Sequence, residues 1–177
     1  MPSGRTHDLA TAVLSIPAFF AANALTGSYK VAAVFTAAFL FGGLMFGPDL
    51  DTASTQYSRW SIFRFIWLPY RAAFAHRSSW THGLVISTIF RLIYFAGVVT
   101  LVSYLSALAV GAYGNMRVDS LMNFSRAWQG LGTFAGKYIG INYLIAAVAG
   151  LWAGSATHTI ADLIFSYIKT GRVMRLF

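Results

Sequence analysis

The sequence predicts an all-α polytopic integral membrane protein, a bundle of about four transmembrane helices with an interfacial amphipathic segment. Of the 177 residues, 57% are hydrophobic and only 10% are charged, and the mean hydropathy is +0.61. Soluble domains carry about 25% charged residues. The chain also contains four long apolar stretches, and about 20 apolar residues in a helix cross a bilayer core of about 30 Å. We therefore expect a single membrane domain over residues 1–177.

The first two membrane helices are expected over residues 9–27 and 31–47. A secretory signal peptide is the alternative for the first, because Ala-Asn-Ala at 22–24 is typical of a cleavage site. The polar segment before it holds one arginine and an acid, which favours a membrane helix, and Pro17 can kink it. The second stretch is short for a full crossing, so we expect it to tilt or to share the interface.

Two further membrane helices are expected over residues 84–110 and 138–168, with a loop and a short interfacial helix between them. Arg91 lies inside the third helix, where an arginine faces the bundle or a polar cavity, or extends to the interface. Glycine pairs four residues apart permit close helix packing, although such spacings are frequent by chance. They are Gly43/Gly47, Gly136/Gly140 and Gly150/Gly154.

Residues 52–75 mix arginines with aromatic residues. The spacing of Arg59, Phe63 and Trp67 predicts a helix that lies in the membrane interface, with its aromatic side chains toward lipid and its arginines toward the headgroups. The alternative is a basic connecting loop with an aromatic belt.

The charge balance bears on partners and orientation. Thirteen lysines and arginines oppose five acids, for a net charge of +8, which in a membrane protein reflects orientation and contact with lipid headgroups. We find no nucleic-acid-binding motif, so the expected partners are the lipid bilayer and other membrane-protein subunits. Basic residues in the loop 48–83 and near both termini place these parts in the cytoplasm. The chain has no cysteine, which excludes disulfides and thiolate zinc sites.

The segment His-Arg-Ser-Ser-Trp-Thr-His at residues 76–82 holds two of the four histidines of the chain. Six residues on a helix correspond to about 240° of rotation, so the two rings cannot share one helical face. We therefore expect a turn or loop that leads into the third helix. Ser79 and Thr81 have an alternative role as caps of that helix.

The predicted topology gathers the histidines and most of the acids on one membrane face. Odd-numbered helices begin on this face and even-numbered helices end on it, so all four helix ends contribute to one site. Imidazole and carboxylate groups without thiolates suit zinc, iron(II), manganese or nickel. The expected metal ligands are His7, Asp49, Asp51, His76, His82, His158 and Asp162.

The spacing within this set supports a shared site. His158 and Asp162 are four residues apart and lie on one helix face. Asp49 and Asp51 are expected to point the same way from an extended segment after Pro48. Seven ligands exceed the needs of one ion, so we expect one or two divalent ions per chain, with zinc first and manganese or iron as alternatives. Each residue alone has an ordinary structural alternative, such as an ion pair between Asp162 and the basic C-terminal tail.

Four motifs give the chain a resemblance to a known family. They are Met-Pro-Ser-Gly-Arg-Thr-His-Asp at 1–8, Phe-Gly-Gly-Leu-Met-Phe-Gly-Pro-Asp-Leu-Asp at 41–51, Trp-Leu-Pro-Tyr-Arg at 67–71 and His-Arg-Ser-x-x-Thr-His at 76–82. They resemble a family of small bacterial metal-binding membrane proteins seen often in cyanobacteria, related to the YdjM-like inner-membrane metal-dependent hydrolases. The resemblance is weakest over 100–150. It implies a bound metal and a bacterial inner or thylakoid membrane. More loosely, His158-x-x-x-Asp162 resembles a helix motif of zinc-dependent phospholipases C.

The sequence thus predicts a metal-dependent hydrolase that acts at the cytoplasmic interface on a membrane-associated substrate, such as a phosphoester lipid. In this hypothesis bound metal activates water, Arg77 is the catalytic residue that binds an anionic oxygen, and Asp8 and Thr81 orient the ligands. Arg77 has an alternative role as a positive-inside anchor. The alternative function is a non-catalytic accessory or assembly subunit with a structural metal. A metal transporter fits less well, because it needs polar ligands near mid-membrane.

Overall fold

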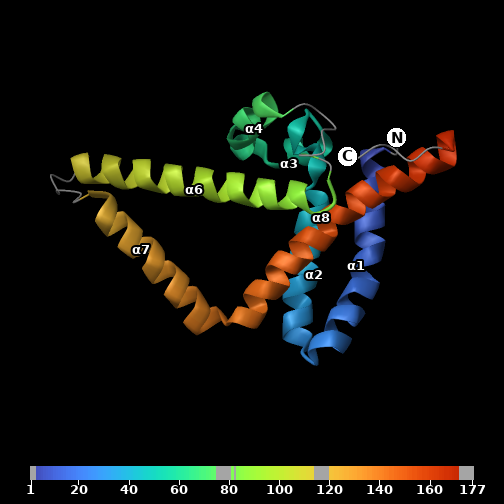
Figure 1. Cartoon of the computed structure of the whole chain (residues 1–177), viewed down its shortest axis with the longest axis horizontal. Coiled ribbons are helices and arrows are strands. Elements are labelled where there is room, and N and C mark those ends of the chain that lie inside the picture. The colour runs from blue at the N-terminus through green and yellow to red at the C-terminus, as the bar shows by residue number, and fades with distance from the viewer. Residues whose placement is uncertain (1–2, 75–80, 82, 114–119, 172–177) are drawn as a thin grey trace. The chain divides into compact units, whose positions relative to one another are not determined.

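The computed structural model describes residues 3–74, 81, 83–113 and 120–171, and over these residues it contains helices and no strands (Figure 1). It divides into two compact units. One consists of the chain up to Arg91 and from Asn142 onward, and the other of Leu92–Ile141. The helices are α1 (Gly4–Thr26), α2 (Tyr29–Leu44), η1 (Pro48–Asp51), α3 (Thr55–Arg59), η2 (Ser61–Trp67), α4 (Leu68–Ala73), α6 (Ile86–Tyr113), α7 (Ser120–Phe134), η3 (Ala135–Ile139) and α8 (Ile141–Thr170).

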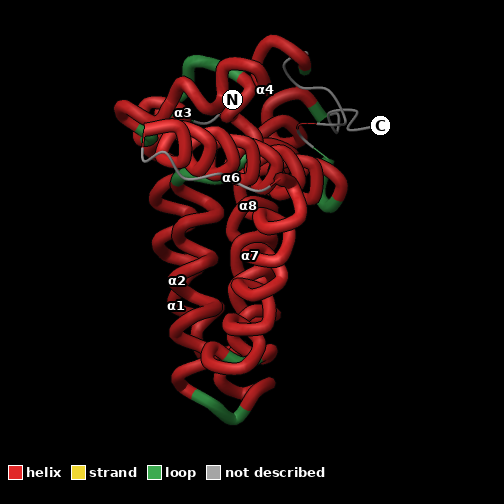
Figure 2. Tube along the Cα trace, turned by 90° about the vertical axis from the view of Figure 1, so that its left-hand side faces the viewer, coloured by secondary structure: helices red, strands yellow, loops and turns green. Residues whose placement is uncertain are grey.

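Helices α1 and α2 form a hairpin in the first unit (Figures 1 and 2). The hydroxyl of Ser3 caps α1 by accepting a hydrogen bond from the Thr6 N–H. The helix ends at Gly27, whose φ of 63° is left-handed and favours glycine. The Ser28 side chain then caps α2. Local capping therefore sets the tight turn, and both helices begin a few residues earlier than the sequence predicts.

Helix α8 crosses α2 at a contact made by glycines. A Cβ atom on Gly154 would overlap the carbonyl oxygen of Phe39, and one on Gly150 would overlap that of Phe35. From the α2 side, a Cβ on Gly42 would overlap a carbonyl oxygen of α8. The backbones of the two helices are thus in direct contact, which is the use of small residues that the Gly150/Gly154 spacing predicts.

The single interfacial helix expected over residues 52–75 is instead three short helices, α3, η2 and α4. Trp67 is completely buried in a cluster of aromatic rings, so it does not face lipid as its spacing with Phe63 suggested. The exposed hydrophobic residues of the segment are Ile62, Phe63, Phe65 and Leu68, and they retain its amphipathic character.

Arg91, in the first turns of α6, is completely buried in the first unit. Its guanidinium donates to the Thr81 carbonyl at 2.9 Å, to the Thr88 hydroxyl at 3.1 Å and to the Ser155 hydroxyl at 2.6 Å. Of the two positions that the sequence allows, the structure therefore selects the inward one. The arginine joins the start of α6 to the middle of α8.

Within the described part of the chain, three helical segments are long and apolar enough to cross a membrane: Gly4–Thr26, Ile86–Ala109 and Ile141–Lys169. Helix α2 is apolar but has only 16 residues. Large hydrophobic side chains are exposed along all three segments. Of the four predicted spanning helices, three meet the length criterion and the fourth is a shorter apolar helix.

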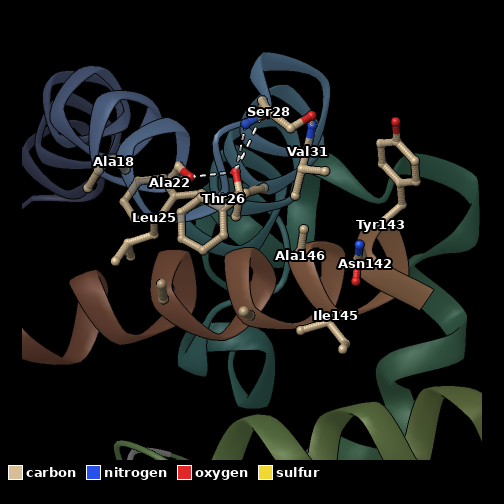
Figure 3. Close-up of a pocket in the computed structure, with 15 residues that line it drawn as sticks. Ala18, Ala22, Leu25, Thr26, Ser28, Val31, Asn142, Tyr143, Ile145 and Ala146 are labelled. Carbon is tan, nitrogen blue, oxygen red and sulfur yellow. Dashed lines mark hydrogen bonds between the residues drawn. The ribbon is translucent and has the colours of Figure 1, made fainter. Parts of the chain in front are cut away.

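An apolar hollow of about 720 Å³ lies between α1, α2 and α8 near the α1–α2 turn (Figure 3). Six of its fifteen lining residues are alanines, and its polar groups belong to Thr26, Ser28, Asn142 and Tyr143. The Thr26 hydroxyl already donates to the Ala22 carbonyl at 2.7 Å. No acid or histidine is among the described residues that line this hollow, so the chemistry predicted for those side chains lies elsewhere.

The α2–α8 contact gives a test of the packing. Gly154→Ala should lower the free energy of unfolding by about 1–3 kcal/mol, because the added methyl group forces the two backbones apart. Gly97→Ala in α6 is the matched control, since a Cβ there meets nothing within 4 Å and alanine favours a helix by about 0.5–1 kcal/mol over glycine. Denaturant unfolding in detergent measures both variants. Equal stability of the two would contradict the backbone contact.

Candidate metal centre

Helices α1 and α8 bring three potential metal ligands into one buried cluster. His7 lies in the first turn of α1, and His158 and Asp162 lie one turn apart in α8. His7 Nε2 is 3.3 Å from Asp162 Oδ1, and His158 Nε2 is 3.8 Å from Asp162 Oδ2. One ligand atom from each residue lies within 4.8 Å of the others, and all three residues are buried. The predicted four-residue spacing on α8 therefore directs both side chains to the same point.

The two histidine rings stack face to face. The ring centroids of His7 and His158 are 3.7 Å apart, and the ring planes differ by 9°. Both Nε2 atoms face the carboxylate of Asp162, each opposite a different oxygen. The parallel rings therefore present two ligand nitrogens side by side to one carboxylate.

The two aspartates of Pro-Asp-Leu-Asp point in different directions. Asp49 Oδ2 lies 3.3 Å from His158 Nε2, so Asp49 joins the cluster. Asp51 is buried and interacts electrostatically with Tyr70 and Arg91. Asp49 also interacts electrostatically with Arg91. Residues 48–51 form a 3-10 helix, in which positions i and i+2 are about 240° apart, and not the extended segment that the sequence predicts.

Gln56, which the sequence argument did not select, fixes the orientation of His158. Its side-chain nitrogen donates to the Gly43 carbonyl at 2.7 Å and lies 3.3 Å from His158 Nδ1. Nδ1 therefore faces Gln56 while Nε2 faces the carboxylates. Gln56 approaches this closely because residue 47 is glycine, whose missing Cβ would overlap the glutamine side chain. Glutamine does not ligate metals as histidine and aspartate do, so sequence reasoning gave it no weight.

Asp8 is held away from the cluster by an ion pair with Arg59. The guanidinium contacts both carboxylate oxygens, at 2.9 and 2.5 Å, and also donates to the Leu44 carbonyl at 2.7 Å. The hydrogen bond that Arg59 donates to Asp8 raises the pKa of Arg59 above its usual value, and burial opposes this shift. Arg59 therefore ties α3 to α1 and α2, instead of extending to headgroups as predicted.

A pocket of about 280 Å³ adjoins the cluster. His7, Asp49 and His158 form part of its wall, so the candidate ligands are accessible from the pocket. The remaining lining residues are small or polar: Gly4, Asp8, Ala53, Ser54, Thr55 and Gln56. The cluster is therefore open to a small polar group in the pocket.

The donor set fits a divalent transition metal. Tetrahedral ligands at about 2.0–2.1 Å from zinc are about 3.3–3.4 Å from one another, and the His7–Asp162 and His158–Asp49 atom pairs are each 3.3 Å apart. His158 Nε2 and Asp162 Oδ1 are buried, yet they make no hydrogen bond of acceptable geometry within the described part of the chain. Buried polar atoms normally have such partners, and a cation would satisfy both atoms.

Three predicted site residues, His76, Arg77 and His82, lie outside the described residues. Thr81, predicted to orient a ligand, is completely buried, and its carbonyl accepts a hydrogen bond from Arg91. Among the described residues, the structure gathers His7, His158, Asp162 and Asp49, and it pairs Asp8 with Arg59.

Comparison with known proteins agrees with a metal-binding function. A family model described as "Uncharacterized metal-binding protein (DUF2227)" matches residues 2–172. No curated protein and no solved structure matches the chain. Because the match covers nearly the whole chain, the protein belongs to this family of uncharacterized metal-binding proteins, DUF2227.

Proposed function

We propose that this protein is a membrane-embedded, metal-dependent hydrolase that acts on a membrane-associated phosphoester at the cytoplasmic interface. The observation that carries the proposal is the buried His7–His158–Asp162 cluster, which opens with Asp49 onto a small polar pocket. The three segments long enough to cross a membrane support embedding. The basic residues of the loop 48–83 support a cytoplasmic site. The resemblance to YdjM-like metal-dependent hydrolases supports the reaction class.

His7, His158, Asp162 and Asp49 would hold the metal, with zinc as the leading candidate and manganese or iron as alternatives. A bound divalent ion supplies a polarised water and stabilises negative charge on the reacting group. Neighbouring side chains of the protein orient the candidate ligands. Gln56 fixes the orientation of the His158 ring, and the Ser54 hydroxyl donates a hydrogen bond of 2.7 Å to the Asp49 carbonyl. Arg77 remains our candidate for binding an anionic substrate oxygen.

The pocket favours an enzyme over the alternative, an accessory subunit with a structural metal. A structural site is closed by its protein ligands, whereas a catalytic site keeps a position open to substrate. The Asp49 side chain is 28% exposed, while those of His158 and Asp162 are each 3% exposed. The cluster is therefore buried on the α8 side and accessible on the η1 side.

Metal content per chain tests the binding part of the proposal. Detergent-purified wild type, supplied with zinc or manganese, should retain at least one equivalent by elemental mass spectrometry. His158→Ala should retain less metal than wild type, because it removes the imidazole that lies beside both Asp49 and Asp162. Asp8→Asn is the matched control, since Asp8 lines the same pocket but pairs with Arg59, and it should retain the metal. A well-folded wild type without metal would contradict the proposal.

The role of Gln56 gives a second prediction. Gln56→Ala should keep the metal stoichiometry but weaken affinity by about 10–100-fold, the usual effect of removing a group that orients a ligand. Ser58→Ala on the same short helix is the control, because Ser58 is exposed and bonds only locally, to the Ser54 carbonyl. Competition against a chelator measures both affinities. An unchanged affinity in Gln56→Ala would show that the glutamine does not orient the ligand.

Hydrolysis is tested on the metal-loaded protein in mixed phospholipid micelles. Wild type should release a phosphorylated or alcohol product, and Asp49→Asn should reduce the rate at least 100-fold, since this carboxylate faces the pocket. Leu50→Ala, one residue along, controls for disturbance of the 3-10 helix. A wild type that holds metal and releases no product would favour the accessory-subunit alternative.

A further inference from the structure

The stacked histidines restrict how metal can bind. An imidazole nitrogen donates through a lone pair that lies in the ring plane. The planes of His7 and His158 are within 9° of parallel and their centroids are 3.7 Å apart, so no nearby point lies in both planes. A single ion between the rings would sit up to about 1.9 Å, half that spacing, outside each plane. One ion therefore cannot bind both rings well in this arrangement.

Two ions fit the same arrangement without moving a ring. Each ion would lie in the plane of its own imidazole, so the ions would be separated by about the ring spacing of 3.7 Å. Two-metal hydrolytic sites hold their ions about 3.5–4 Å apart. The stacking of the two imidazole rings therefore disfavours one shared ion, and it matches the distance expected between two ions.

The carboxylates are divided between the two positions. Asp162 Oδ1 faces His7 Nε2 at 3.3 Å, and Asp162 Oδ2 faces His158 Nε2 at 3.8 Å. One carboxylate thus presents a separate oxygen to each histidine, which is how a carboxylate bridges two ions. Asp49 Oδ2 lies 3.3 Å from His158 Nε2, so it adds a ligand to the second position only.

We propose that the cluster binds two divalent ions: one on His7, the other on His158 and Asp49, with Asp162 bridging them. The inference rests on the proposed metal-binding function and adds a second metal position to it. It also bears on the substrate. Two dications against the carboxylates of Asp162 and Asp49 leave a net charge of +2, while Asp8 is balanced by Arg59. Such a site suits an anionic group, as in a phosphoester.

Manganese binding to the full chain in detergent tests this inference. Metal is removed with a chelator, Mn²⁺ is titrated back, and bound ions per chain are counted by elemental analysis. Electron paramagnetic resonance on the same samples distinguishes isolated Mn²⁺ from a pair, because ions this close are magnetically coupled. Wild type should bind two Mn²⁺ per chain and show the coupled signal in place of the isolated one.

Single variants separate the two positions. His7→Ala and Asp49→Ala should each bind one Mn²⁺ with an isolated signal, since each removes ligands from a different ion. Asp8→Asn should still bind two. With only one shared ion, both His7→Ala and Asp49→Ala would instead reduce the bound metal from one equivalent toward none. Circular dichroism confirms the helical fold of each variant, and the wild-type count decides the matter if a variant does not fold.

The outcomes separate this inference from the proposed function. One Mn²⁺ per chain at saturation, with an isolated signal, would overturn the two-ion arrangement and leave a metal-binding protein. No bound ion after exposure to manganese and zinc would overturn both. Two ions with uncoupled signals would overturn the bridging role of Asp162, because they would have to lie much farther apart than the stacked rings.

Discussion

The direct backbone contact between α2 and α8 is the constraint on which the site depends. Gly150 and Gly154 of α8 lie against carbonyl oxygens of α2, and one turn beyond Gly154 the same helix carries His158. The segment that follows α2 contains Asp49, whose Oδ2 lies 3.3 Å from His158 Nε2. A wider crossing would separate the carboxylate from the imidazole. The glycines thus affect the candidate metal site, because they set the distance between the two helices that carry its residues.

The acids in this part of the chain differ in their partners. Asp8 pairs with Arg59, whereas Asp49 and Asp162 each have an oxygen 3.3 Å from a histidine nitrogen. Asp49 and Asp51 both interact electrostatically with the buried Arg91. Burying a carboxylate without compensation is costly. Asp162 is buried, and its Oδ1 makes no hydrogen bond within the described part of the chain, so a bound cation would offset part of that cost.

Several features of the site could be predicted because they depend on local geometry. The four-residue spacing of His158 and Asp162 places both on one helix face whatever the helix packs against. Asp49 and Asp51 could not be assigned in the same way, since their directions depend on a 3-10 turn that only the packed segment reveals. The roles of Gln56 and Arg59 were missed, because each acts through a partner distant in the sequence.

The sequence by itself determined the helical class, the apolar segments and the supply of metal-binding side chains, because these follow from composition, periodicity and helix caps. It also indicated which ends of the helices carry the polar residues. Only the tertiary structure decided that Asp49 lies beside His158, and that the rings of His7 and His158 lie parallel. The physical reason is that ring orientation and carboxylate direction are set by contacts between residues far apart in the chain, which no local pattern encodes.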